Sequence, residues 1–277
     1  MKLRCADRIL DLSSPQVMGV LNVTPDSFSD GGDYASLDAA LLRAREMVSQ
    51  GVAIIDVGGE STRPGAAKVA LQQELDRVVP LVERIASQLD ICISVDSSSP
   101  EVMLAAQAAG AHMLNDVRAL QRDGAIGAAQ QAELPVCLMH MQGEPDTMQL
   151  DPNYDHMLND VHSFLGARIQ ACIDGGIPRD QILMDPGFGF GKSVEHNYQL
   201  LANLEDFKSH NVPILIGLSR KSMIAAVLNN CSVNERLSGS LAGAVIAAMN
   251  GAHIIRVHDV KETVDALKIV QATQQQQ

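Results

Sequence analysis

The chain has 277 residues, of which 46% are hydrophobic and 19% charged, and its formal net charge is −12 at pH 7. Such an acidic chain lacks the basic surface that nucleic-acid binding requires, so we expect no nucleic-acid partner. No apolar run reaches the roughly 18–20 residues of a membrane span, and the N-terminus does not resemble a signal peptide, so we expect a cytoplasmic protein without a membrane partner.

Eight short and nearly continuous apolar runs recur along the chain and predict strands that are buried on both faces. They cover residues 17–22, 52–57, 91–96, 112–116, 135–140, 182–185, 213–219 and 253–258. Helical patterns fill the gaps between the runs. These patterns cover residues 37–50, 71–89, 153–174, 197–209, 234–250 and 260–273.

Eight strands that alternate with helices favour a closed (β/α)8 TIM barrel of the α/β class, built by a single domain over residues 1–277. A doubly wound open sheet is the alternative, but it usually has fewer strands and a glycine fingerprint after the first strand. Residues 274–277 read QQQQ and are expected to form a frayed tail. Five scattered cysteines are interpreted as reduced thiols, as in a cytoplasmic protein.

Most of the predicted strands end in a polar or charged residue. These are Asn22, Asp56, Asp96, Asn115 with Asp116, His140, Asp185, Ser219, Arg256 and His258. In a (β/α)8 barrel the carboxyl ends of the strands meet at one mouth, where active sites lie. Capping of the following helix explains one or two such positions, and we assign that role to Asp56 and Asp116.

Asp96, Asn115 and Asp185 end three different strands, so their side chains are expected to converge. Carboxylates can accept paired N–H bonds from the edge of a flat heterocycle, and this is the interpretation that we favour. A divalent metal held by oxygen ligands is the alternative.

A second group is cationic and indicates that an anionic group of the substrate binds nearby. It consists of Arg63, Lys221, Arg256 and His258. The loops after the seventh and eighth strands often form a phosphate site in such barrels. Arg220 is interpreted as a solvated surface charge.

Three loops combine glycine with functional side chains. NVTPDSFSDGG (22–32) contains Asn22, Phe28 and Asp30, ESTRPG (60–65) contains Thr62, Arg63 and Pro64, and DPGFGFGKS (185–193) contains Phe188 and Phe190. The last loop fits a phosphate-binding P-loop poorly. Because three of the five phenylalanines lie in these loops, we expect at least one ring to stack on a ligand.

Several motifs together resemble those of the dihydropteroate synthase family. They are NVTPDSFSDGG, IIDVGGESTRPGA, SVDSSSPEV, LMHMQG, DPGFGFGK, GLSRKSM and GAHIIRVHDV, and they span most of residues 15–270. The resemblance implies a (β/α)8 barrel that condenses a dihydropterin diphosphate with 4-aminobenzoate and releases diphosphate. The sequence departs from the family at Ser97-Ser98-Ser99, where Thr-x-Lys is frequent.

The resemblance also implies a role for individual residues. The pterin would be bound by Asp96, Asn115, Asp185 and Lys221. The diphosphate would contact Thr62, Arg63, Arg256 and His258, and Asn22 would help to hold Mg2+ on it. 4-Aminobenzoate would pack near Thr62, Pro64, Phe190, Lys221 and Ser222. The residues expected to act in catalysis are Asp96, Lys221, Phe28 and Asp30, the last two at the tip of a closing loop.

Two other functions remain open from the residues. A methyltetrahydrofolate:corrinoid methyltransferase barrel would share Asp96, Asn115 and Asp185, and a non-catalytic pterin binder would share the fold. The resemblance further implies a homodimer. The apolar run AGAVIAAM (242–249) is a candidate for its surface, with a buried core helix as the alternative.

Overall fold

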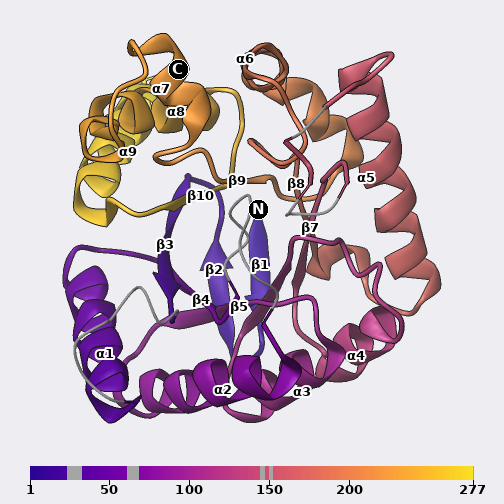
Figure 1. Cartoon of the computed structure of the whole chain (residues 1–277), viewed down its shortest axis with the longest axis vertical. Coiled ribbons are helices and arrows are strands. Elements are labelled where there is room, and N and C mark those ends of the chain that lie inside the picture. Colours follow the sequence, from indigo (N-terminus) through magenta and orange to yellow (C-terminus); the bar gives the residue numbers. More distant parts are fainter. Residues whose placement is uncertain (24–32, 61–68, 144–146, 150–151, 277) are drawn as a thin grey trace.

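A computed structural model of the chain describes residues 1–23, 33–60, 69–143, 147–149 and 152–276. Parallel strands lie at the centre of these residues and helices surround them (Figure 1). The strands of the large sheet are β3 (Gln16–Asn22), β4 (Ile54–Gly58), β5 (Cys92–Asp96), β6 (Met113–Asp116), β7 (Val136–Met139), β8 (Ile182–Asp185), β9 (Leu215–Ile216) and β10 (Ile254–Val257). The predicted (β/α)8 barrel is confirmed.

The sheet runs in the order β8-β7-β6-β5-β4-β3-β10-β9, and every neighbouring pair in it is parallel. A single bridge between Met184 and Ile214 joins its two edges and closes the barrel. At this seam the Met184 N–H donates to the Pro213 carbonyl at 3.0 Å. The strand predicted at 213–219 is only two residues long, because the chain leaves the sheet at Gly217.

The helices pack around the barrel, and most of them lie where the sequence pattern predicts. They are α1 (Asp33–Ser49), α2 (Leu71–Gln88), α3 (Pro100–Ala108), α4 (Ala125–Ala132), α5 (Met157–Asp174), α6 (Val194–Ala202), α7 (Ser222–Val227), α8 (Leu237–Met249) and α9 (Val260–Gln274). The helices at 125–132 and 222–227 were not predicted, and the one predicted at 197–209 is divided into a helix at 194–202 and a 3-10 turn at 204–210. Short 3-10 turns are η2 (Arg179–Gln181), η3 (Leu204–His210) and η4 (Val233–Glu235). Over the described ranges, none of the helices has both the length and the apolarity that crossing a bilayer demands.

The first strands of the chain, β1 (Lys2–Cys5) and β2 (Arg8–Asp11), form an antiparallel hairpin that the sequence analysis did not predict. Leu3 and Cys5 of this hairpin are buried, with 1% and 0% exposure. Together with Leu12 they pack against the residues near the start of each barrel strand, such as Ile54 and Cys92. The hairpin therefore closes the amino-terminal end of the barrel.

Two separate apolar clusters show which side of the barrel wall each residue faces. The inner cluster holds Ile54, Cys92, Met113, Leu183 and Ile254 with the hairpin. The outer cluster holds their sequence neighbours, such as Ile55 and Ile93, together with the helices. Strand residues alternate between the two sides, as the period of two for side chains requires. Both sides are apolar near the start of the strands, which explains why the runs show no alternation in the sequence.

Candidate active site

Polar side chains form a layer above the inner cluster, toward the carboxyl ends of the strands. A residue two or four positions after an inner-cluster residue faces the inside of the barrel as well. Among the residues at these positions are Asp56, Ser94, Asp96, Asn115, Asp185 and Arg256, which we call the polar layer. In such barrels this is the end at which active sites are built.

Arg256 joins three strands of the polar layer. Its Nε donates to Asp56 Oδ2 at 2.6 Å, and its Nη2 donates to Asp96 Oδ2 at 2.9 Å. Asn115 Nδ2 donates to the same Asp56 oxygen at 3.1 Å. Asp96, predicted to bind a heterocycle, and Arg256, predicted to bind an anionic group, are therefore in direct contact inside the barrel. Asp96 and Asp185 accept from protein donors and Asn115 donates to Asp56, and the described residues contain no cluster of three or more His, Cys, Asp or Glu that could hold a metal.

Asp56 differs from its predicted role. It does not cap a helix but is fully buried inside the barrel between Asn115 and Arg256. Asp116 stabilises the turn after β6, because its carboxylate accepts from the Arg118 and Leu120 N–H groups at 2.8 and 2.7 Å. The signal that could have identified Asp56 is its position two residues after Ile54, in phase with the residues that face inward.

Burial sets the protonation of the polar layer. It raises the pKa of Asp96 to about 7, against the opposing effect of Arg256, and the charge of Asp56 raises it further. Burial also raises the pKa of Asp185. Although burial alone would lower the pKa of Arg256, the carboxylates of Asp56 and Asp96 raise it above its usual value. The guanidinium therefore stays charged, while Asp96 titrates near neutral pH.

The loop after β8 wraps closely around the Asp185 side of the polar layer. Asp185 Oδ1 accepts from the Gly187 N–H at 2.7 Å. Gly187 has a φ of +74°, and a Cβ there would lie 1.8 Å from the His140 carbonyl oxygen, so only glycine fits. Phe188 is fully buried in the outer cluster and is a core residue. Of the two rings in this loop, Phe190 alone is partly exposed.

Lys221 lies against this loop, after β9. Its Nζ donates to the Phe188 carbonyl and lies 4.5 Å from the centroid of the Phe190 ring. Burial lowers the pKa of Lys221 to about 8, although the nearby Asp185 carboxylate acts to raise it. Ser222 follows as the exposed first residue of α7. Lys221, Phe190 and Asp185 thus border one region of the mouth.

The predicted site residues do not include Lys192, and His140 has no predicted role. Lys192 is 2% exposed, and its Nζ donates to His140 Nδ1 at 2.9 Å, to the Gly187 carbonyl at 2.9 Å and to the Phe190 carbonyl at 3.2 Å. Burial lowers the pKa of Lys192 to about 7, and burial with the Lys192 charge lowers that of His140 to about 3. The pair ties the β8 loop to the end of β7.

The remaining predicted residues lie around the β3 and β10 ends. His258 Nδ1 lies 3.2 Å from Ser219 Oγ, so His258 is anchored to the β9 end. Asn22 is the last residue of β3 and is partly buried opposite Gly58. Arg220 forms two hydrogen bonds with Asp259, which corrects its interpretation as a free surface charge. Five predicted residues lie outside the described residues: Phe28, Asp30, Thr62, Arg63 and Pro64.

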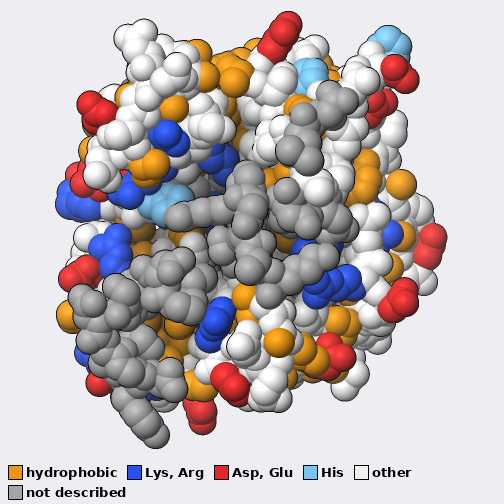
Figure 2. Space-filling model, viewed as in Figure 1, with side chains coloured by type: hydrophobic (Ala, Val, Ile, Leu, Met, Phe, Trp, Pro, Cys, Tyr) orange, Lys and Arg blue, Asp and Glu red, His pale blue; other side chains and the backbone are white. Residues whose placement is uncertain are grey.

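Charge is unevenly distributed over the surface. On the face shown in Figure 2, most Asp and Glu side chains lie toward the rim, whereas Lys and Arg side chains occur both at the rim and nearer the middle. A few cations placed together can attract a small anion even when the net charge of the protein is negative.

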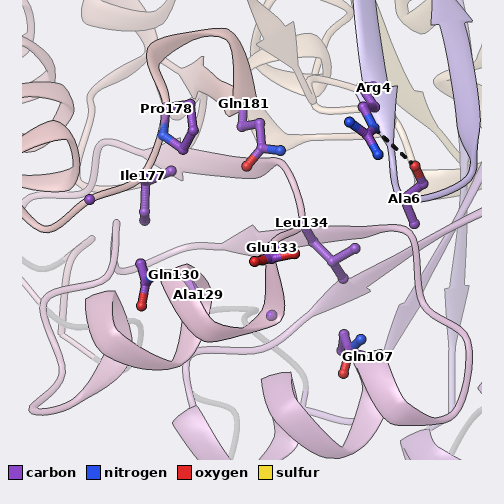
Figure 3. Close-up of a pocket in the computed structure, with 12 residues that line it drawn as sticks. Arg4, Ala6, Gln107, Ala129, Gln130, Glu133, Leu134, Ile177, Pro178 and Gln181 are labelled. Atoms are coloured by element: carbon purple, nitrogen blue, oxygen red, sulfur yellow. Dashed lines mark hydrogen bonds between the residues drawn. The ribbon is translucent and has the colours of Figure 1, made fainter.

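A separate cavity of about 360 Å3 lies at the opposite end of the barrel (Figure 3). Arg4, Gln130, Glu133, Ile177 and Gln181 are among the residues that line it. It contains no residue of the polar layer, and its charged residues Arg4 and Glu133 are exposed. We therefore place the candidate active site at the polar layer.

The chain is similar to known proteins over most of its length. A model of the family described as "Pterin binding enzyme" matches residues 18–258. The chain is 57% identical to the dihydropteroate synthase of Escherichia coli (strain K12) over 273 residues, which are 99% of this chain and 96% of that protein.

Solved structures of similar proteins cover essentially the whole chain. A Yersinia pestis dihydropteroate synthase in a sulfonamide drug complex is 54% identical, covers 100% of both chains and has a TM-score of 0.95. A Xanthomonas albilineans dihydropteroate synthase in complex with 7,8-dihydropteroate is 45% identical, covers 99% of both chains and has a TM-score of 0.91.

Proposed function

The chain belongs to the pterin-binding enzyme family, among its dihydropteroate synthases, and from this premise we propose how its polar layer carries out the reaction. The enzyme condenses (7,8-dihydropterin-6-yl)methyl diphosphate with 4-aminobenzoate, giving 7,8-dihydropteroate and diphosphate. The residues alone also allowed a corrinoid methyltransferase or a non-catalytic pterin binder. The similarity to dihydropteroate synthases selects the synthase activity over both.

We assign the pterin ring to the polar layer. Asp96 and Asn115 on the neighbouring strands β5 and β6, and Asp185 on β8, present carboxylate and amide groups with which N–H groups of the ring can be paired. Lys221 lies at the Asp185 side and can donate to an acceptor of the ring. The surrounding burial strengthens these bonds because water competes with them less.

The diphosphate would lie toward the β10 end of the mouth. Arg256 and His258 are two residues apart there and face the same side, and the guanidinium keeps its charge. Thr62 and Arg63 are proposed to complete this anion site. Positive charge at this position stabilises the departing diphosphate.

Asn22 is the residue that would hold Mg2+, and its surroundings fit this role. A Cβ on Gly58 would lie 3.0 Å from Asn22 Oδ1 and 3.6 Å from Asp96 Cβ, so the glycine keeps open the space beside the amide oxygen. Mg2+ in such sites takes one or two protein oxygens and otherwise substrate phosphates and water. When bound, Mg2+ neutralises charge on the diphosphate and makes it a better leaving group.

The chain's own residues support an SN1-like reaction. The C–O bond to diphosphate breaks with its electron pair on the leaving group, and the methylene carbon keeps a positive charge that the dihydropterin delocalises. The negative charge of Asp96 stabilises this cation. The amine of 4-aminobenzoate then forms the C–N bond and loses a proton. Phe190, Lys221 and Ser222 border its approach. Pro64 is proposed to pack beside it, and Phe28 and Asp30 to close over it.

One observation carries this mechanism. Arg256 lies 2.9 Å from Asp96, so the cation that receives the departing anion and the carboxylate that stabilises the remaining cation belong to one network. Charge can therefore separate within the polar layer while each product remains beside an opposite charge.

Release of pyrophosphate tests the assignment. We expect release only when both substrates and Mg2+ are present, and we expect Asp96→Asn to lower kcat by roughly 100-fold or more, as loss of a transition-state electrostatic partner does. Asp265→Asn, an exposed carboxylate on α9, is the control and should keep its activity. Turnover of Asp96→Asn close to that of the wild type would refute the role of Asp96.

We also propose a cytoplasmic homodimer. All five cysteines are unpaired, which suits a reducing compartment. The predicted helix α8 buries Gly243, Ala244 and Ala247 but exposes Ile246 and Met249. An apolar strip left exposed on a helix suits association with a second copy of the chain.

A further inference from the structure

Asp56 is the most deeply buried ionisable residue of the polar layer, and none of the steps proposed above uses it. Its exposure is 0%, and no element of the sequence beyond its phase in β4 marks it as functional. Burying a carboxylate is costly unless it is paired, so its retention inside the barrel needs a physical reason.

A single oxygen of Asp56 holds two residues that are proposed to contact different parts of the substrate. Oδ2 accepts from Arg256 Nε at 2.6 Å, on the side proposed for the diphosphate. The same atom accepts from Asn115 Nδ2 at 3.1 Å, on the side proposed for the pterin. A bond from an ionised carboxylate to a guanidinium is short, strong and directional.

This contact fixes how Arg256 presents its guanidinium. With Nε on Asp56 and Nη2 on Asp96, the planar group has two of its nitrogens engaged. Within the described part of the chain, Nη1 makes no hydrogen bond, so it is available to an anion. A planar fork held at two points loses little further freedom when it binds a phosphate oxygen.

The other oxygen of Asp56 is also informative. Oδ1 is buried and has no hydrogen-bond partner among the described residues. Both hydrogen bonds that the carboxylate accepts from described residues therefore converge on Oδ2, the atom that contacts Arg256 and Asn115.

We propose that Asp56 is a positioning residue that aligns Arg256 and Asn115 for the pterin diphosphate. This inference rests on the proposed roles of Arg256 and Asn115 and goes beyond them. Asp56 does not touch the reacting atoms but acts through the two side chains bonded to its Oδ2.

Asp56→Asn tests the proposal, because it keeps the shape of the side chain and removes its charge. We expect kcat/KM for the pterin diphosphate to fall by roughly 10- to 100-fold, the effect of losing a charge-assisted hydrogen bond. The KM for 4-aminobenzoate should change by less than about threefold, because neither Arg256 nor Asn115 is proposed to contact this substrate. An equal rise in KM for both substrates would overturn the proposal.

Met113→Leu is the control. Met113 is fully buried in the inner cluster, two residues before Asn115, and lies outside the polar layer. The substitution nearly conserves the volume of the side chain, so both kinetic constants should stay close to those of the wild type. Loss of kcat/KM in Met113→Leu equal to that in Asp56→Asn would show a general response to change in the barrel interior and would also overturn the proposal.

A double-mutant cycle separates this proposal from the role of Arg256 itself. If Asp56 acts through Arg256, Asp56→Asn should add less than about threefold to the loss already caused by Arg256→Met, because contacting residues are not additive. Full additivity would refute the positioning role. If Arg256→Met alone leaves the pterin diphosphate KM unchanged, the proposed diphosphate site fails instead.

A measurement on the wild-type protein does not depend on the folding of any variant. The Nε–H of Arg256 should give a 15N-resolved NMR signal that is protected from exchange and that persists when inorganic pyrophosphate and Mg2+ are added. Disappearance of this protected signal on binding would show that Arg256 leaves Asp56 to meet the anion, contrary to the proposal.

Discussion

At the scale of single residues, each buried charge of the mouth is held by partners from other strands or loops. Arg256 of β10 bonds to Asp56 of β4 and Asp96 of β5, and Lys192 bonds to His140 at the end of β7. Such groups are expensive to bury, and their partners determine which protonation state is stable. Protonation at these positions is therefore linked to folding.

His140 gives a pH dependence whose sign can be derived. Its pKa is lowered from 6.5 to about 3, because burial and Lys192 both oppose the charged form. The unfolded chain therefore binds a proton between pH 6.5 and 3 that the folded chain does not bind. The contribution of His140 to stability is complete above pH 6.5 and falls as the pH decreases through this window, by about 2 kcal/mol at pH 5.

We expect His140→Asn to flatten this loss of stability in acid. The amide oxygen can accept from Lys192 as Nδ1 does, but it cannot bind a proton in this range. Urea unfolding of both proteins at pH 7.5 and pH 5 measures the difference, and any cost common to both pH values cancels. An equal loss in the two proteins would exclude His140 as its source.

At the scale of elements, the amino-terminal hairpin and the β8 loop close opposite ends of the barrel. The hairpin covers the inner cluster, and the loop covers the Asp185 side of the mouth. The interior of the barrel is a packed core. The amino-terminal end of this core must therefore be covered by side chains that do not come from the barrel strands. Leu3 and Cys5 supply them.

Leu3→Ala should destabilise the fold by about 2–5 kcal/mol, because it leaves a cavity in the inner cluster. Ile9→Ala on the same hairpin is the control: Ile9 is 69% exposed, so its truncation should change stability by less than about 0.5 kcal/mol. The free energy of unfolding in urea measures both effects. Similar small values for the two variants would show that the hairpin does not contribute to the core.

At the scale of the whole molecule, the barrel uses its two ends and its outer surface differently. The carboxyl end collects the polar layer, the amino end is sealed by apolar residues, and α8 exposes an apolar strip on the outside. Association through α8 would leave the mouth open to substrates. This arrangement is typical of barrels, in which the residues for stability and those for chemistry lie at opposite ends.

Ile246→Glu combined with Met249→Glu tests the homodimer. We expect the wild type to sediment as a dimer and the double variant as a monomer, because charges would be buried at the interface. Leu42→Glu on α1 is the control; Leu42 is 59% exposed but lies on a different helix. A wild type that is monomeric at micromolar concentration, or a double variant that remains dimeric, would contradict the proposal.

The order of the barrel strands and of most helices followed from the sequence alone, whereas α4 and α7 were not predicted. The eight apolar runs identified β3 to β10 because strands covered on both sides must be apolar throughout, and their polar ends indicated the mouth. The motifs in the loops indicated the family and the reaction. The β1–β2 hairpin was not predicted, because each of its strands has only four residues, too few for a clear hydrophobic pattern.

Only the tertiary structure decided which polar residues meet. Asp56 and Arg256 are 200 residues apart, and their contact depends on the inward phase of two strands and on barrel closure at Met184 and Ile214. Lys192 and His140 meet for the same reason, through the close approach at Gly187. A local sequence pattern predicts a helix or a strand because it reflects which residues of that segment are buried. A site depends on the distances between residues of different segments, and the sequence of one segment does not determine these distances.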